Sequence, residues 1–125
     1  MPHAISWFEI PTTDFARART FYEAMLGTTL MPMEAPGRKM AAFPADWSKG
    51  EISGCIVQGQ GAQPAATGTL IFLNCDPDLA AALGRVVKAG GKIVLPKTEI
   101  PMQGAGHMAI ITDTEGNSIG LHSAK

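Results

Sequence analysis

The chain lacks any apolar run long enough to cross a membrane as a helix. Such a helix needs roughly 20 consecutive apolar residues, and the uninterrupted apolar runs here are far shorter. The opening residues also lack the basic segment, apolar stretch and cleavage site of a signal peptide. We therefore expect a cytoplasmic protein with no membrane partner.

A surplus of one charge is also absent. Ten Lys and Arg residues nearly balance eleven Asp and Glu residues, for a formal net charge of −1. The basic residues form no run, whereas proteins that bind nucleic acids usually cluster them on one face. The sequence therefore predicts no nucleic-acid partner.

Cysteine is scarce, with only Cys55 and Cys75 in the chain. The two residues lie far apart in the sequence and lack the close spacing of a zinc site. We expect both to be buried, reduced thiols, as is common in cytoplasmic proteins.

What is present is the composition of a folded domain. Hydrophobic residues make up 46% of the 125 residues and charged residues 17%, which is typical of globular proteins and not of disordered ones. A chain of this length buries a core of its own. We therefore predict a single domain spanning residues 1–125.

The first half of the chain predicts a strand followed by a helix. Residues 5–10 are rich in β-branched and aromatic side chains, as strands are, and Pro11 ends the run. Asp14 is a favourable N-cap, and apolar residues recur at three- and four-residue spacing over 15–26. Gly27 stops the helix as a C-terminal glycine does.

The second half repeats this layout. Residues 70–73 are typical of a buried strand, and Asp76-Pro77-Asp78 supplies a cap with proline in the first turn. An apolar stripe with helical spacing follows over 79–87, and Gly90 and Gly91 close it.

The segments that follow the two helices are equally long, and each has room for three short strands. The expected strands are 29–34, 38–44, 53–58, 92–96, 107–112 and 117–122. This order predicts an α+β fold of two tandem βαβββ units, 4–58 and 67–122, joined by a flexible linker at 59–66.

Local motifs add to this pattern. WFEIPTTD at 7–14 leads into ARTFY at 18–22 and LG at 26–27, and GGKI at 90–93 and IITDTEGN at 110–117 follow. Together they resemble the vicinal oxygen chelate superfamily, the glyoxalase/bleomycin resistance/extradiol dioxygenase group. The resemblance implies a curled mixed sheet that forms a half-barrel cleft, with the helices outside.

The same resemblance implies where metal ligands would stand. In the family's metal enzymes, a His or Gln of the first strand, a Glu of the fourth, a His of the fifth and a Glu of the eighth hold a divalent ion. Those positions fall on Trp7, near Cys55, on Thr69 or Leu70, and on Gly120. Indole, glycine and leucine side chains do not bind such ions. We therefore expect no metal and no other cofactor.

Strand alternation predicts which side chains face the cleft. Trp7 and Glu9 share one face of the first strand, and Gly120 and His122 share one face of the last. The candidate pocket contains Glu9 as a catalytic residue and, as ligand-binding residues, Trp7, Cys55, Phe72, His107 and His122.

Each candidate also has a structural interpretation. Trp7 either fills the space that a metal would take or provides a stacking surface. Glu9 is either a functional acid, base or anchor, or half of an ion pair with an arginine. His107 and His122 are either residues at strand ends or catalytic groups.

Three functions fit these observations. The first is a metal-free protein that binds a small, partly apolar molecule, to sequester it or to transform it by acid–base chemistry. The second is a metal-dependent lyase, isomerase or dioxygenase that uses Glu9, His107 and His122 as ligands. The third is a protein-interaction domain. Under all three we expect a homodimer, because the resemblance implies clefts completed across a two-fold interface.

Overall fold

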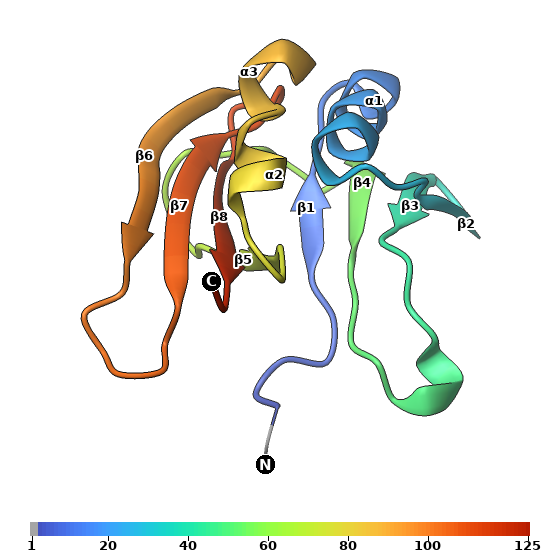
Figure 1. Ribbon diagram of the computed structural model, residues 1–125. Coiled ribbons are helices and arrows are strands. Elements are labelled where there is room, and N and C mark those ends of the chain that lie inside the picture. The colour runs from blue at the N-terminus through green and yellow to red at the C-terminus, as the bar shows by residue number, and fades with distance from the viewer. Residues whose placement is uncertain (1–2) are drawn as a thin grey trace.

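Two four-stranded mixed sheets, one from each half of the chain, frame the protein (Figure 1). The structure is a computed structural model that describes residues 3–125. The first sheet has the order β1-β4-β3-β2 and consists of β1 (Glu9–Pro11), β2 (Met31–Ala35), β3 (Arg38–Ala42) and β4 (Cys55–Gly59). The second has the order β5-β8-β7-β6 and consists of β5 (Phe72–Asn74), β6 (Lys92–Glu99), β7 (His107–Thr112) and β8 (Ser118–Ser123). The α+β class and the two βαβββ units predicted from the sequence are confirmed.

Both sheets use the same pairing. The first strand of each unit runs parallel to the last, so that Glu9 lies opposite Cys55 and Phe72 lies opposite Gly120. The other ladders are antiparallel. β1 is shorter than the expected strand 5–10, because its partner β4 begins at Cys55 and leaves the preceding residues without a ladder.

The helix of the first unit has the predicted bounds. α1 (Phe15–Leu26) begins after Asp14, whose side chain accepts a hydrogen bond from the backbone N–H of Arg17 at 3.1 Å. Gly27 ends it in the left-handed conformation, with φ at 66°. No helix within residues 3–125 is long and apolar enough to span a membrane.

The prediction of a single helix in the second unit is wrong. Two four-residue helices, α2 (Ala80–Leu83) and α3 (Val86–Ala89), take its place. Gly84 follows α2, and Arg85 donates its backbone N–H to the oxygen of Ala82, three residues back. Glycine inside a helix costs about 1 kcal/mol relative to alanine, and the side chain of neither N-cap residue, Leu79 or Arg85, bonds the start of its helix. The chain therefore turns before continuing.

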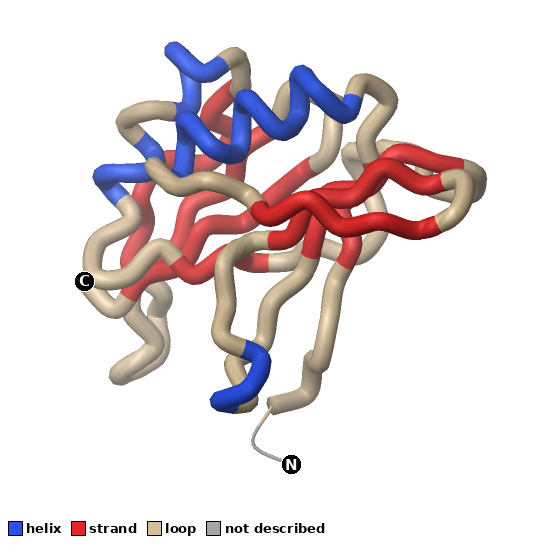
Figure 2. The backbone as a smooth tube through the Cα atoms, turned by 90° about the vertical axis from the view of Figure 1, so that its right-hand side faces the viewer, coloured by secondary structure: helices blue, strands red, loops and turns tan. Residues whose placement is uncertain are grey.

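The three helices lie together on one side of the strands, and a short 3₁₀ helix, η1 (Trp47–Lys49), lies at the opposite end (Figure 2). α1 contacts both α2 and α3, so the helices join the two units. They share one hydrophobic core with both sheets, which includes Ile10, Phe21, Tyr22, Met25, Leu73, Val86, Ile111 and Leu121. Burial of each large side chain in this core contributes about 1.5–3 kcal/mol.

Polar contacts also tie the units together. The Tyr22 hydroxyl of α1 donates to Asp113 of the second unit at 2.6 Å, and Asn117 donates to the oxygen of Pro11. Burial and the Asp113 carboxylate raise the pKa of Tyr22 well above its usual value. Glu115 accepts from the backbone N–H of Asp14 at 2.8 Å, at the start of α1. The first helix is therefore anchored by the turn that precedes β8.

Candidate functional site

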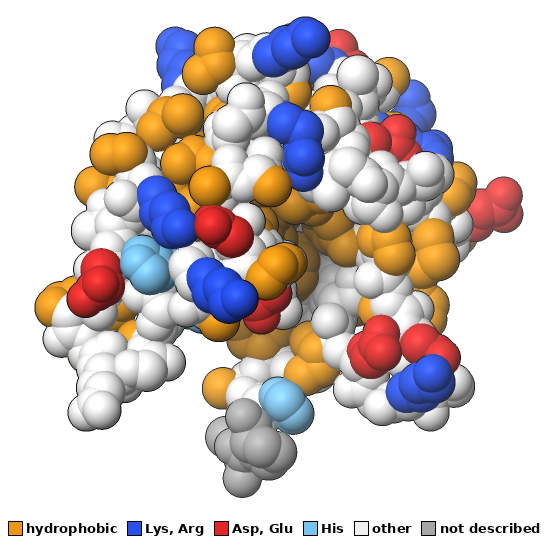
Figure 3. Space-filling model, viewed as in Figure 1, with side chains coloured by type: hydrophobic (Ala, Val, Ile, Leu, Met, Phe, Trp, Pro, Cys, Tyr) orange, Lys and Arg blue, Asp and Glu red, His pale blue; other side chains and the backbone are white. Residues whose placement is uncertain are grey.

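A cavity of about 760 Å³ lies between the two units, beneath the helices. Figure 3 shows this hollow between the two arms of the molecule, with hydrophobic side chains inside it. Phe8 and Phe43 line it from the first unit, and Ile71 and Leu73 line it from the second. Its walls are therefore apolar and come from segments distant in the sequence.

The first unit supplies the aromatic end of this inter-unit cavity. The rings of Phe8 and Phe43 lie 5.7 Å apart, and Ser53 donates its hydroxyl to the oxygen of Phe43 at 2.7 Å. A Cβ added at Gly54 would overlap the ring of Phe8. Glycine is therefore needed at that position for Phe8 to lie where it does.

The second unit supplies the charged end. Asp78 accepts from Lys97 Nζ at 2.9 Å and from the N–H of Ala80. These two hydrogen bonds lower the pKa of the Asp78 carboxyl. Asp76 accepts from the backbone N–H of Ala124 at 2.7 Å. Both carboxylates in the cavity lining thus already have donors within the protein.

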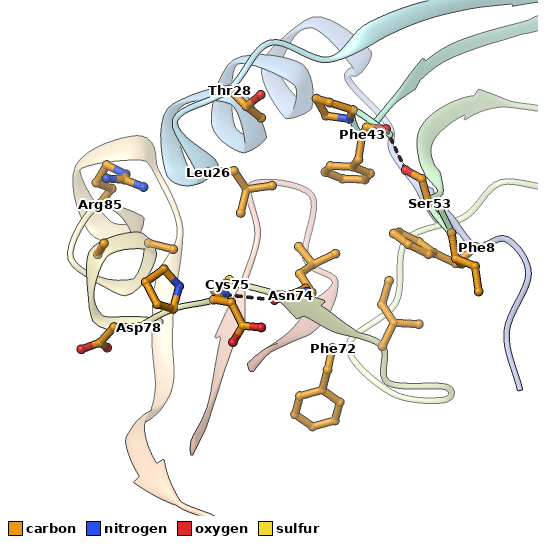
Figure 4. Close-up of a pocket in the computed structure, with 18 of the residues that line it drawn as sticks. Phe8, Leu26, Thr28, Phe43, Ser53, Phe72, Asn74, Cys75, Asp78 and Arg85 are labelled. Carbon is orange, nitrogen blue, oxygen red and sulfur yellow. Dashed lines mark hydrogen bonds between the residues drawn. The ribbon is translucent and has the colours of Figure 1, made fainter. Parts of the chain in front are cut away.

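Arg85 is the cation of the cavity lining. Its Nε donates to the oxygen of Met25 near the end of α1, at 2.8 Å. Figure 4 draws Arg85 and Asp78 at one end of the cavity and Phe8 and Phe43 at the other. The cavity is therefore amphipathic along its length.

Cys75 also borders the cavity, as a buried thiol. Burial is the main reason why its pKa is raised to about 11. At neutral pH the side chain is therefore a thiol and not the thiolate that acts as a nucleophile.

Three of the residues singled out in the sequence lie together on the first sheet. Trp7 Nε1 donates to Glu9 at 3.4 Å, and Glu9 lies opposite Cys55 in the ladder. Arg38 forms an ion pair with Glu9 at 2.6 Å. The ion pair with an arginine that the structural interpretation of Glu9 predicted is therefore present. Trp7 also packs edge-on against Trp47, at 5.9 Å between ring centroids.

The other three lie on the second sheet. Phe72 lines the inter-unit cavity and is 47% exposed. His122 Nε2 lies 2.6 Å from the oxygen of Ala105. His107 Nδ1 is buried and has no hydrogen-bond partner among residues 3–125. Of the six candidates, only Phe72 lines this cavity, and the roles predicted for all six stay predictions.

Residues 3–125 contain no group of three or more His, Cys, Asp and Glu side chains arranged to hold a metal. Glu9, His107 and His122 therefore do not form the ligand set of the metal-dependent alternative.

The residues at the family's ligand positions do not fit a divalent ion either. Burial, followed by the charge of Glu9, raises the pKa of the Cys55 thiol to about 11. Gly120 lies under Phe72, because a Cβ added there would overlap the Phe72 ring. With the Trp7 indole completing the set, these positions offer no anionic oxygen and no imidazole.

No local pattern marks Phe43 or Arg85 as cavity residues. Phe43 lies at the end of the predicted strand 38–44, and Arg85 lies within the predicted helical stripe 79–87. The sequence predicts only a helix cap for Asp76-Pro77-Asp78, whereas the side chains of Asn74, Asp76 and Asp78 line the cavity.

Comparisons with known proteins indicate the same superfamily that the sequence motifs resemble. The model of the Glyoxalase/Bleomycin resistance protein/Dioxygenase superfamily matches residues 4–121. CFP32 of Mycobacterium bovis, a protein assigned as a glyoxylase, is 28% identical over 122 residues, which are 95% of this chain and 45% of that protein. CFP32 of Mycobacterium tuberculosis matches to the same extent. The chain thus spans less than half the length of these curated relatives.

Solved structures share the fold at low sequence identity. A glyoxalase/bleomycin resistance protein from Albidiferax ferrireducens has a TM-score of 0.69 at 17% identity, with 98% of this chain and all of that chain (100%) covered. A protein of the same description from Streptomyces sp. CB03234 has a TM-score of 0.65 at 24% identity, with 94% and 97% covered. A glyoxalase I mutant from Zea mays has a TM-score of 0.70 at 20% identity, with 98% of this chain and 47% of that chain covered.

Proposed function

We propose that this chain, which belongs to the Glyoxalase/Bleomycin resistance protein/Dioxygenase superfamily, binds a small, partly apolar molecule in the inter-unit cavity. The observation that carries the proposal is the cavity itself, which has apolar walls and a charged end. Its volume of about 760 Å³ falls within the roughly 300–1,000 Å³ of small-molecule sites.

Binding without chemical transformation is the form of this function that the cavity favours. Cys75 is held as a thiol by its raised pKa, and Asp78 is neutralised by Lys97. General bases in enzymes usually have a pKa shifted toward neutrality, whereas the pKa of Asp78 is lowered. Glu9, the catalytic residue predicted from the sequence, lies outside the cavity lining.

The test uses N-phenyl-1-naphthylamine, an uncharged dye that becomes fluorescent in apolar surroundings. Ala81 lines the cavity from α2, whereas its neighbour Ala80 is exposed outside the lining. We expect Ala81→Trp to fill the cavity mouth and weaken dye binding at least about tenfold, and Ala80→Trp to bind like the unchanged protein.

Circular dichroism melting of both variants controls for folding. Equal dye binding by Ala81→Trp, Ala80→Trp and the unchanged protein would place the dye elsewhere and would refute the proposal. Absence of dye binding to the unchanged protein would refute it as well.

We also propose that the protein forms a homodimer. Apolar side chains are exposed on both sheets, with Met31 at 37% and Phe72 at 47%, and burying them against a second copy of the chain would stabilise a dimer. Sedimentation velocity across a range of protein concentrations is the test. Twice the mass of one chain is expected, and the mass of a single chain throughout would reject the dimer.

A further inference from the structure

Arg85 is held in place by one of its nitrogens only. Its Nε donates to Met25 near the C-terminal end of α1, where a cation is favoured by the exposed carbonyl groups. The guanidinium also lies over Gly27, since a Cβ added to that glycine would be 3.5 Å from Nη2 of Arg85. This contact orients the side chain but leaves both terminal nitrogens free of any acceptor within residues 3–125.

The other arginines of the chain differ from Arg85 in this respect. Each of them is paired with a carboxylate: Arg17 with Glu115, Arg19 with Glu23, and Arg38 with Glu9. Arg85 forms no ion pair with any residue in 3–125, although it borders a cavity that also contains two aspartates. The carboxylates that could neutralise it accept from other donors, since Asp78 bonds Lys97 and Asp76 bonds the backbone of Ala124.

A second free donor, the side chain of Asn74, also lines the cavity. The side-chain oxygen of Asn74 accepts from the backbone N–H of Asp76 at 3.0 Å, which leaves the Asn74 amide nitrogen directed elsewhere. This nitrogen donates to no acceptor within residues 3–125. The polar part of the cavity thus offers unused donors, whereas each of its two carboxylates already accepts at least one hydrogen bond within the protein.

The opposite end of the cavity has no charge. Phe8 and Phe43 pack there, and Leu26 lies between them and Arg85 (Figure 4). A ligand that fills the whole cavity therefore contacts aromatic side chains at one end and a guanidinium at the other.

We infer that the ligand is an amphipathic anion, whose carboxylate or sulfonate binds Arg85 and whose aromatic or aliphatic body lies against Phe8 and Phe43. Arginine presents two parallel N–H groups that match the two oxygens of such an anion. This inference rests on the proposed function, because it names the class of ligand that the same cavity takes.

Two dyes with the same aromatic body test it. N-phenyl-1-naphthylamine is neutral, and 8-anilinonaphthalene-1-sulfonate adds one sulfonate. We expect Arg85→Gln to weaken binding of the sulfonate about five- to tenfold, as loss of a hydrogen bond to a charged group at a partly exposed site does. Binding of the neutral dye should change by less than about twofold, because its apolar contacts remain.

Lys88→Gln is the matched control. Lys88 is an exposed cation on α3 outside the cavity lining, and its loss removes the same charge. Its binding of both dyes should equal that of the unchanged protein. Added salt should weaken sulfonate binding more in the unchanged protein than in Arg85→Gln, because screening acts on the ion pair.

The outcomes separate the two claims. Equal weakening of both dyes by Arg85→Gln would mean that the residue only supports the cavity wall, and would overturn the anion inference alone. The same holds if Lys88→Gln weakens the sulfonate as much as Arg85→Gln does. If the neutral dye fails to bind the unchanged protein, the proposed function fails first, and the inference fails with it.

Discussion

The two units of the chain share one strand order but differ in their helices. The first unit has a helix of 12 residues with a capping side chain at its start and a left-handed glycine at its end. The second has two helices of 4 residues each, and in neither does the N-cap residue bond the helix with its side chain. A repeated plan of strands therefore does not require a repeated helix.

The difference explains where the cavity and its cation come from. α1 buries four residues against the sheets, Ala18, Phe21, Tyr22 and Met25, whereas α2 and α3 bury one each, Ala82 and Val86. The shorter helices fill less of the junction. The turn between them carries Arg85, whose side chain reaches the end of α1.

The first unit is nevertheless dependent on the second. Glu115 accepts hydrogen bonds from the N–H groups of Thr13 and Asp14 and pairs with Arg17. Its side chain is fully buried, at 0% exposure. A carboxylate of the second unit thus binds the residues at the start of α1 in the first unit.

The largest effect is expected from Glu115→Ala. The change leaves two N–H groups of the α1 start and the Arg17 guanidinium without their acceptor, and we expect a loss of about 3 kcal/mol in the free energy of unfolding. Urea denaturation measures it. Glu34→Ala is the control, because Glu34 is exposed in β2 and should change stability by less than about 0.5 kcal/mol. A loss below 1 kcal/mol for Glu115→Ala would show that the units are not coupled in this way.

The same contact predicts a dependence on pH. Burial by itself would raise the pKa of Glu115, but hydrogen bonds from Arg17 and from the N–H of Asp14 lower it from 4.5 to about 2. A carboxyl with a lowered pKa stabilises the fold fully above its unfolded value and loses that contribution as the pH falls through its folded value. The unchanged protein and Glu115→Ala should therefore differ less in their free energy of unfolding at low pH. The difference should fall by about 2–3 kcal/mol between pH 5 and pH 2. A gap that stays constant over this range would contradict the assignment.

A smaller effect should distinguish the helix caps. Asp14→Ala removes the N-cap of α1 and should cost about 1 kcal/mol. Asp78→Ala removes a half-exposed carboxylate that accepts from Lys97 and from the N–H of Ala80 at the start of α2. Its effect on the free energy of unfolding should be smaller, because water screens the pair with Lys97. Thermal and urea unfolding of the two variants compare them directly. Equal losses of unfolding free energy for Asp14→Ala and Asp78→Ala would contradict the prediction that α1 depends more on its capping side chain than α2 does on Asp78.

The smallest effect is expected on the first sheet. Glu9→Gln breaks the ion pair with Arg38, and both side chains are 35% exposed. We expect a loss of about 0.5 kcal/mol, which should shrink in 1 M salt. The second sheet has no equivalent pair, since Phe72 lies at the position corresponding to Glu9. A loss above 2 kcal/mol would instead assign Glu9 a central structural role.

Local sequence was enough for elements whose ends are specified by neighbouring residues. Asp14 and Gly27 set the bounds of α1, because a cap acts on N–H and carbonyl groups within one turn of it. The break between α2 and α3 was missed, since the apolar stripe over 79–87 continues through Gly84 with helical spacing. Periodicity reports which side faces the core and not whether the backbone hydrogen bonds continue.

The candidate site shows the same limit. Strand alternation predicted Trp7 and Glu9 on one face, and the Trp7 indole does donate to Glu9, although Trp7 precedes β1. The contact between Phe8 and Phe43 and the hydrogen bond from Arg85 to Met25 join segments far apart in the chain. Such contacts depend on how the units pack, which no local pattern contains.

The motifs at 7–27 and 90–117 indicated the family. Residue propensity and period over short windows predicted the α+β class and the order of the strands, because both act locally, but not the break between α2 and α3. Only the tertiary structure decided where the cavity lies, that it has an aromatic and a cationic end, and which carboxylates are already paired. These properties depend on distances between side chains from different units. Those distances are set by the packing of α1 against α2 and α3 and by the anchoring of α1 on Glu115.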